Sequence, residues 1–268
     1  MRQSKAFTLV ELLVVLAIIS ILLAVMSPTF RGTMVRGQAT QCAKNQENIL
    51  AAWTQYASNH RMIISSANTS NHGCVNGCVK PIHFTCEHDC SGPHSREWCH
   101  WRDTWVASGQ YGNSLQAIEK GVLYQYLNNA ATYRCPTPVY NYYSSYSFNG
   151  LLRGEGGAGQ GSVEDFRSIR DPSHCMAMIE DDDFRGYNQN SWMLGGINTW
   201  IDYVGGNHGD GDNLGFCDGH VEFWQWKDPD TLSFPYPPGS SNPDDRKFGI
   251  SDPGSVDIQR VYEVFWPL

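Results

Sequence analysis

The sequence is poor in basic residues. Lysine and arginine together account for 19 of the 268 residues, against 27 aspartates and glutamates, and the formal net charge is −8. Proteins that bind nucleic acids carry basic patches that neutralise phosphates, so this composition argues against a nucleic-acid partner. An acidic surface is instead compatible with cations as ligands.

Short motifs of several large enzyme classes are also missing. The sequence contains no Gly-x-x-x-x-Gly-Lys-Ser/Thr phosphate-binding loop and no Gly-x-Ser-x-Gly nucleophile elbow. His208, Asp210, Asp212 and Asp218 could form a metallohydrolase cluster, but their stretch reads as a β-hairpin, which is a structural setting. We therefore expect a protein that is not an enzyme.

Charge is almost absent near the start of the chain. Of the twenty residues from 7 to 26, Glu11 is the only charged one. As a helix, twenty apolar residues span about 30 Å, the thickness of the hydrocarbon core of a bilayer. Arg2 and Lys5 precede this stretch and the next basic residue is Arg31. This asymmetry predicts a membrane span with a cytoplasmic N-terminus and an exported remainder.

Two ordinary interpretations of the apolar stretch are a cleaved secretory signal peptide and a simple signal anchor. The apolar region of a signal peptide is usually shorter, about 7–15 residues, and ends at a small-x-small site. Ala24-Val25-Met26 is a poor site of that kind. Neither interpretation explains Glu11, because a carboxylate inside a membrane span is costly unless it finds a partner.

The segment Ala6-Phe7-Thr8-Leu9-Val10-Glu11 resembles the processing site of type IV prepilins and type II secretion pseudopilins. The resemblance implies that residues 1–6 are a leader peptide, and that cleavage after Ala6 exposes the amine of Phe7 for N-methylation. Glu11 would then stay in the bilayer. The residue before the cut is usually Gly in that family and is Ala6 here. Pro28 stands where the family often carries a helix-bending proline.

The same resemblance implies how subunits would assemble. In a filament, Glu11 is expected to pair with the Phe7 amine of a neighbouring subunit, and the cost of an unpaired charge in a low-dielectric setting would fix the register. The implied partners are identical subunits, a prepilin peptidase, and a pilus or secretion assembly machinery with its ATPase and inner-membrane platform. The implied location is the inner membrane for the precursor, and an extracellular or cell-surface filament for the assembled protein.

The N-terminal helix is expected to continue beyond the membrane and to cover residues 7–60. Pro28, Gly32 and Gly37 weaken its middle, since proline lacks a donor and glycine loses more entropy on ordering. From residue 39 onward a stripe recurs at steps of three and four, made of Cys42, Gln46, Ile49, Trp53 and Tyr56. This pattern predicts an amphipathic half whose stripe packs on a β-sheet.

Residues 61–268 are expected to form an extracellular globular head built on an antiparallel sheet, which makes the fold α+β. The strongest strand signal is Asp218-Gly219 between two alternating apolar runs, which predicts a hairpin within residues 200–226. Further expected elements are a short helix in 115–130, a short strand at Tyr133–Cys135, a strand over His174–Glu180 and an irregular tail over 228–268.

His208, followed by nine residues and then Asp218-Gly219, resembles the H-x9-DG region at the C-terminus of many prepilin-type proteins. That family also carries a Cys-Pro pair, a Ser-Tyr-x-x-Asn segment and an acidic strand end. The matching positions here are Cys135-Pro136, Ser145-Tyr146-Ser147-Phe148-Asn149 and Glu180-Asp181. We interpret His208, Asp218 and Gly219 as a structural motif in which His208 pins its loop to the Asp218 turn.

Nine cysteines, an odd number, leave at least one thiol unpaired. In an exported head disulfides are the first expectation, and residues 65–114 form a Cys- and His-rich insertion with two C-x3-C units. A zinc site in this insertion is the alternative, although zinc knuckles prefer C-x2-C spacing. Cys42, on the helix, is the candidate free or intermolecular thiol. The disulfide candidates are Cys74, Cys78, Cys86, Cys90, Cys99, Cys135, Cys175 and Cys217.

A calcium site is a further possibility in the predicted hairpin. Asp210, Asp212, Asn213 and Asp218 supply oxygen donors in a Gly-containing segment, and Asp202 could add another. The competing interpretation is that these residues only form turns and cap strands.

The sequence as a whole predicts a structural subunit of a type IV pilus-like filament, assembled through its N-terminal helix after prepilin processing. One alternative is a pseudopilin of a type II secretion system. Another is a membrane-anchored surface protein that binds glycans through aromatic platforms. Such platforms would come from the tyrosines of residues 140–146 and from Trp98, Trp101, Trp105, Trp192 and Trp200, which could equally fill the core.

Overall fold

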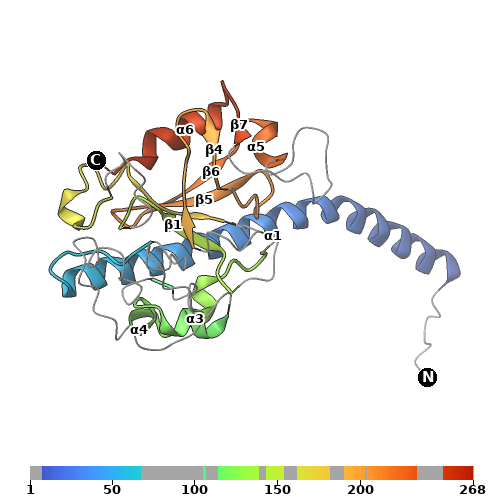
Figure 1. Ribbon diagram of the computed structural model, residues 1–268. Coiled ribbons are helices and arrows are strands. Elements are labelled where there is room, and N and C mark those ends of the chain that lie inside the picture. Colours follow the sequence, from blue (N-terminus) through green and yellow to red (C-terminus); the bar gives the residue numbers. More distant parts are fainter. Residues whose placement is uncertain are drawn as a thin grey trace.

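A computed structural model provides the fold of the chain (Figure 1). It describes residues 8–67, 105–106, 114–138, 143–153, 162–181, 190–202, 204–233 and 250–267, without the side chains of residues 25–31, 250 and 251. The expected cleavage site, Ala6 and Phe7, and nearly all of the Cys- and His-rich insertion lie outside the described residues.

The first described element is a single long helix, α1, which runs from Leu9 to Asn59. Thr8 caps its N-terminus, because its side chain accepts a hydrogen bond from the backbone N–H of Glu11. α1 continues without a break through Pro28, Gly32 and Gly37. Its N-terminal half projects away from the rest of the molecule (Figure 1). None of the helices, as far as they are described, is both long and apolar enough to cross a membrane.

A five-stranded sheet forms the centre of the head, with strand order β3-β1-β2-β5-β6. All neighbouring strands are antiparallel except β1 and β3, which are parallel. Its strands are β1 (Tyr146–Asn149), β2 (Met176–Glu180), β3 (Ser191–Trp192), β5 (Gly211–Phe216) and β6 (Val221–Gln225). β4 (Thr199–Trp200) and β7 (Ile250–Ser251) form a separate two-stranded sheet. The expected α+β fold, with a helix on a mostly antiparallel sheet, is confirmed.

The C-terminal half of α1 lies on one face of this sheet. All five residues of the predicted stripe are at most 3% exposed. Trp53 is fully buried, with its ring centroid 5.7 Å from that of Phe148 on β1 and 5.2 Å from that of Phe166. The helical periodicity from residue 39 onward therefore predicted both the buried face and its partner.

Side chains of α1 lie close against Gly215 on β5. A Cβ atom at this position would lie 2.7 Å from Leu50 Cδ1 of α1 and 3.0 Å from Met178 Cγ of β2. The absence of a side chain at Gly215 thus leaves room for the side chain of Leu50 against the strand.

We expect Gly215→Val to lower the free energy of unfolding by about 1–3 kcal/mol, because added atoms overpack a filled core. Gly37→Ala is the matched control: nothing lies within 4 Å of a Cβ at that helical position, so it should stabilise by roughly 0.5–1 kcal/mol. Urea denaturation of both variants measures this, and a loss at Gly37 equal to that at Gly215 would contradict the close approach.

The opposite face of the sheet is covered by a C-terminal helix, α6 (Val256–Phe265). Ile258, Val261 and Phe265 are fully buried on it and belong to a second apolar core with residues of β2, β3 and β5. Asp257, also buried, accepts hydrogen bonds from the backbone N–H groups of residues 227 and 228. The prediction of an irregular tail is therefore wrong: a short helix, α5 (Pro229–Ser233), precedes α6, and α6 completes the core.

The region between α1 and β1 is more broken than its pattern predicts. Two short helices, α3 (Leu115–Lys120) and α4 (Tyr124–Leu127), replace the single expected one. They separate at Gly121, where a Cβ would lie 2.1 Å from the carbonyl oxygen of Trp105. The strand predicted at Tyr133–Cys135 is wrong, because a 3-10 helix, η2 (Ala130–Tyr133), occupies its start. Another 3-10 turn, η3 (Phe166–Ser168), precedes β2.

Three of the tryptophans that were candidates for a glycan-binding platform are core residues. Trp105, Trp192 and Trp200 are at most 2% exposed, and Trp192 stacks edge-on against Trp200 and Phe265. Tyr146 is buried as well, whereas Tyr143 is 45% exposed. Trp98 and Trp101 lie outside the described residues. The described tryptophans therefore support the packing interpretation.

Candidate functional site

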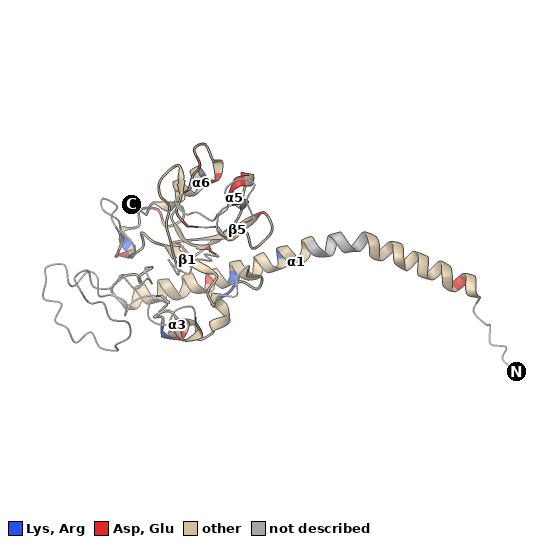
Figure 2. Cartoon of the chain, turned by 45° about the vertical axis from the view of Figure 1, so that its right-hand side comes forward, with Lys and Arg blue, Asp and Glu red and all other residues tan. Residues whose placement is uncertain are grey.

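The N-terminal half of α1 is almost free of charged residues (Figure 2). It exposes apolar side chains on all sides. Its large side chains are between 44 and 77% exposed in the single chain. They are Leu9, Val10, Leu12, Leu13, Val14, Val15, Leu16, Ile18, Ile19, Ile21, Leu22 and Leu23. A continuous apolar surface of this kind marks a contact with membrane or protein.

Glu11 sits at the start of this apolar helix. Its Oε2 accepts hydrogen bonds of 2.8 Å from both the backbone N–H and the hydroxyl of Thr8. Together with the bond from Glu11 N–H to Thr8 Oγ1, this is a reciprocal capping box. The carboxylate is thus held at the N-terminal end of α1, and its second oxygen takes no part in the capping box.

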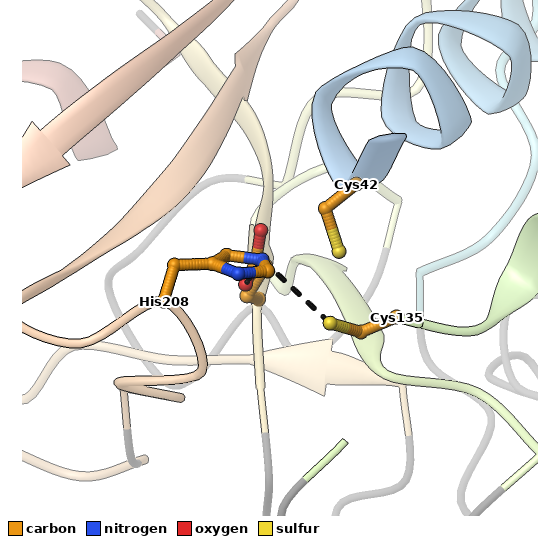
Figure 3. Close-up of side chains that lie close together, drawn as sticks. Cys42, Cys135 and His208 are labelled. Atoms are coloured by element: carbon orange, nitrogen blue, oxygen red, sulfur yellow. Dashed lines mark hydrogen bonds and ion pairs between the residues drawn. The ribbon is translucent and has the colours of Figure 1, made fainter. Parts of the chain in front are cut away.

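A second candidate site lies inside the head, where four side chains from distant parts of the chain meet. They are Cys42, Cys135, Glu180 and His208, all buried. One ligand atom from each, the two Sγ atoms, a carboxylate oxygen and an imidazole nitrogen, lie within 4.8 Å of one another. Cys42, Cys135 and His208 point toward a common centre (Figure 3).

Each member is carried by a different segment. Cys42 belongs to the buried stripe of α1, and Glu180 ends β2. Cys135 follows η2, and its sulfur accepts a hydrogen bond from the backbone N–H of Thr137. His208 lies in the loop before β5. That loop is fixed by the buried Asp212, whose carboxylate accepts hydrogen bonds from Gly206 N–H, Asn207 N–H and Trp226 Nε1.

The imidazole Nε2 of His208 is the point on which the cluster converges. It lies 3.1 Å from Glu180 Oε2 and 3.6 Å from Cys135 Sγ. The other Glu180 oxygen, Oε1, accepts a bond of 2.6 Å from Asn213 Nδ2, and the Cys42 sulfur lies 3.1 Å from the hydroxyl of Tyr146. Oε2 therefore points inward while the outer atoms are tied to neighbouring strands.

The pKa shifts within the cluster favour the charged forms of His208 and Cys135. Hydrogen bonding to Cys42 lowers the pKa of Cys135 to about 5, against the opposing effect of burial. Burial lowers the pKa of His208, but its hydrogen bonds to Cys135 and Glu180 outweigh this and raise the pKa to about 10. Burial raises the pKa of Glu180, which the His208 contact opposes, and burial also raises that of Cys42.

This arrangement is not that of a catalytic triad. In a triad the nucleophile and the orienting carboxylate contact different ring nitrogens, whereas Cys135 and Glu180 both face Nε2 of His208. The side chains of Glu180 and His208 are 0% exposed. The residue types suit ligation of a borderline-soft metal ion instead.

Several predicted interactions are not formed. His208 was expected to reach the Asp218 turn, but Asp218 pairs with His220 Nδ1, and His208 turns toward Glu180. Gly219 does adopt the left-handed backbone that the hairpin turn needs, with φ of +98°. The Asp-Gly turn was therefore predicted correctly, and the role assigned to His208 was wrong.

The four proposed calcium ligands are not brought to one place. Asp212 faces the loop before β5, whereas Asn213, on the next position of the strand, bonds to Glu180. Asp210 accepts from Gln225 Nε2 at one end of β5, and Asp218 lies in the turn at the other end. Asp202 accepts a hydrogen bond from Met193 N–H. Alternation along the strand separates Asp212 from Asn213, and the length of β5 separates Asp210 from Asp218, so the four donors do not meet at one place.

Among the described residues, the cysteines Cys42, Cys135, Cys175 and Cys217 are free and buried. Cys42 is not apart from the others, as the sequence suggested, because it lies beside Cys135. Cys217 is paired through its backbone with Cys175, donating its N–H to the Cys175 carbonyl. The remaining candidates, Cys74, Cys78, Cys86, Cys90 and Cys99, lie outside the described residues.

Comparison with known families concerns the start of the chain. Residues 1–27 match the family described as the prokaryotic N-terminal methylation motif. No curated protein and no solved structure matched the chain. The matched residues include Ala6, Phe7 and Glu11, the positions of the expected processing site. The chain thus begins with a type IV pilin-like prepilin segment.

Proposed function

We propose that the chain is a structural subunit of a type IV pilus-like extracellular filament, assembled through α1 after prepilin processing. The observation that carries this proposal is that the prepilin segment leads into a helix whose two halves have different surroundings. The N-terminal half exposes apolar side chains, while the C-terminal half is already buried against its own sheet.

The exposed half needs an apolar environment both before and after assembly. In the precursor the inner membrane supplies it, and in the filament the helices of other subunits supply it. When the N-terminal halves of several subunits pack on one another, their apolar surfaces are buried against each other and no longer face lipid or water. Head-to-tail contacts related by a screw do not close on themselves, so identical subunits form an open helical polymer.

Processing creates the charge that would fix the register. Cleavage after Ala6 leaves a positive amine on Phe7, close to the helix end where Thr8 already holds the Glu11 carboxylate. A neighbouring subunit would present its own amine to this carboxylate. Because an unpaired charge is expensive in an apolar surrounding, only registers that satisfy both groups are stable.

The first test of the proposal is the N-terminus of the mature protein. We expect mass spectrometry of the full chain from its native membrane to show a protein that starts at a methylated Phe7. Ala6→Gly, which restores the usual residue before the cut, should be processed equally or better. Ala6→Leu should accumulate as the precursor. A wild-type protein that retains Met1 would overturn the proposal and favour a simple anchored head.

The same mechanism would serve a pseudopilin of a type II secretion system. Electron microscopy of the native cell surface separates the two. A pilus subunit should be found in sheared surface fibres, whereas a pseudopilin should form none unless it is overproduced. The proposed machinery, a prepilin peptidase with an assembly ATPase and inner-membrane platform, is common to both.

A further inference from the structure

We propose that Cys42, Cys135, Glu180 and His208 bind one zinc ion in a closed, four-coordinate site that fastens α1 to the head. The proposal does not depend on filament assembly. It assigns a function to two thiols, a carboxylate and an imidazole that are buried together in the head and lie outside the prepilin segment.

The spacing of the four atoms fits tetrahedral coordination. Zinc–sulfur bonds of about 2.3 Å and zinc–nitrogen or zinc–oxygen bonds of about 2.0–2.1 Å give tetrahedron edges of roughly 3.3–3.8 Å. The His208 Nε2 to Cys135 Sγ distance is 3.6 Å and the Nε2 to Glu180 Oε2 distance is 3.1 Å. All four atoms fall within 4.8 Å of one another, so only small side-chain shifts are needed.

Neighbouring groups hold the ligands in the orientation that a metal requires. Asn213 donates to the outer oxygen of Glu180 from both its backbone and its side chain, which leaves Oε2 directed inward. In the part of the chain that the structure describes, the partner of Oε2 is His208 Nε2, at 3.1 Å. Thr137 N–H bonds to the Cys135 sulfur, and the Tyr146 hydroxyl lies against that of Cys42. Outer partners of this kind orient metal ligands.

A zinc ion accounts for the cluster better than either simpler arrangement. A disulfide between Cys42 and Cys135 would leave Glu180 and His208 as a separate buried ion pair. Burying that pair carries a desolvation cost, and the pair itself would not require two sulfurs beside it. The metal-free cluster places two acceptors, Cys135 Sγ and Glu180 Oε2, on the single nitrogen Nε2 of His208. A doubly charged cation gives every one of these atoms a partner. Two thiolates exclude calcium and magnesium, which take oxygen ligands.

The zinc ion would connect α1 to the head at the place where the helix packs on it. Its ligands come from α1, the segment after η2, the end of β2 and the loop before β5. These segments are far apart in sequence, so the site exists only in the folded chain. The free energy of metal binding would therefore add to the free energy of folding.

The first test is the metal content of the full chain purified in detergent. We expect His208→Gln and Glu180→Gln to contain one zinc equivalent less than the wild type, measured by inductively coupled plasma mass spectrometry. The Cys175→Ser/Cys217→Ser double variant is the matched control, because it removes two buried thiols outside the cluster and should keep the wild-type content. Comparing variants with the wild type by difference removes any metal held by residues 65–114. Equal zinc in wild type and His208→Gln would overturn the proposal.

A second measurement keeps the test valid if those variants fail to fold. Cobalt substituted into the wild-type chain should give the strong visible absorption of a tetrahedral ion and a thiolate-to-cobalt band. In Cys42→Ser this band should lose about half of its intensity, because one of two thiolates is removed. An unchanged band in Cys42→Ser would contradict the site. A Cys42–Cys135 disulfide, found by peptide mapping of unreduced wild-type protein, would do the same.

Discussion

Glu11→Gln is expected to remove the protein from filaments while leaving its cleavage and its fold intact. The amide keeps the shape of the side chain and can still accept the hydrogen bonds that Thr8 donates to Oε2. It loses only the negative charge. Removing one partner of a charge pair in an apolar setting costs about 3–5 kcal/mol. Because 1.36 kcal/mol is a factor of ten, this weakens each subunit addition by roughly a hundredfold or more.

The measurement is the yield of the protein in sheared surface fibres, compared with its total amount in the cell. Mass spectrometry of the same sample should show the normal methylated N-terminus, so a failure of assembly is distinguished from a failure of processing. Fibres at the wild-type level in Glu11→Gln would show that the charge does not fix the register.

Thr8→Val is the matched control for the local role of Glu11. It removes the hydroxyl that shares the capping box but keeps the carboxylate. Loss of an N-cap costs about 1 kcal/mol, which is local to the end of the helix. We therefore expect Thr8→Val to assemble, at a reduced yield at most. If Thr8→Val and Glu11→Gln fail equally, the capping box rather than the charge pair is what assembly requires.

The elements that the sequence predicted best are those defined by local patterns. The stripe from Cys42 to Tyr56 repeats at helical spacing, and a helix with this stripe must bury it, which led to the sheet as its partner. The Asp218-Gly219 turn follows from the left-handed backbone that glycine accepts. In both cases neighbouring residues contain all of the required information.

The C-terminal helix was missed although its pattern is present in the sequence. Ile258, Val261 and Phe265 follow one another at steps of three and four, and all are buried. The surrounding tail is rich in proline and glycine, which outweighed a helix of only ten residues. Its stability comes from packing on the sheet rather than from its own propensity.

The buried cluster could not be predicted from spacing, because its members are separated by tens of residues and meet only through the fold. The sequence instead suggested a metal site from aspartates that are close along the chain. In a strand, successive side chains point to opposite faces, so Asp212 and Asn213 diverge. Cys135, Tyr146, Glu180 and His208 are all positions of the stated resemblance to the H-x9-DG proteins, a resemblance that stays a prediction, and the structure brings these four residues together.

Trp53→Ala is expected to lower the free energy of unfolding by about 3–5 kcal/mol, the usual cost of removing a buried tryptophan. The indole is fully buried between α1 and the sheet and contacts the rings of Phe148 and Phe166. Because domains are stable by only about 5–15 kcal/mol, this loss would be a large share of the total. Urea denaturation of the full chain in detergent, followed by far-ultraviolet circular dichroism, measures it without relying on tryptophan fluorescence.

Two further variants show whether packing or polarity sets the cost at Trp53. The indole N–H finds no hydrogen-bond acceptor within the described residues, so Trp53→Phe removes an unsatisfied buried donor together with some apolar volume. We expect it to cost far less than Trp53→Ala, since an unsatisfied buried donor costs about 1–3 kcal/mol in the wild type. Gln55→Ala, on the exposed side of the same helix, should stay within about 0.5 kcal/mol of the wild type. If Trp53→Ala behaved like Gln55→Ala, the C-terminal half of α1 would not be packed on the sheet, and a site that joins Cys42 to the head would lose its basis.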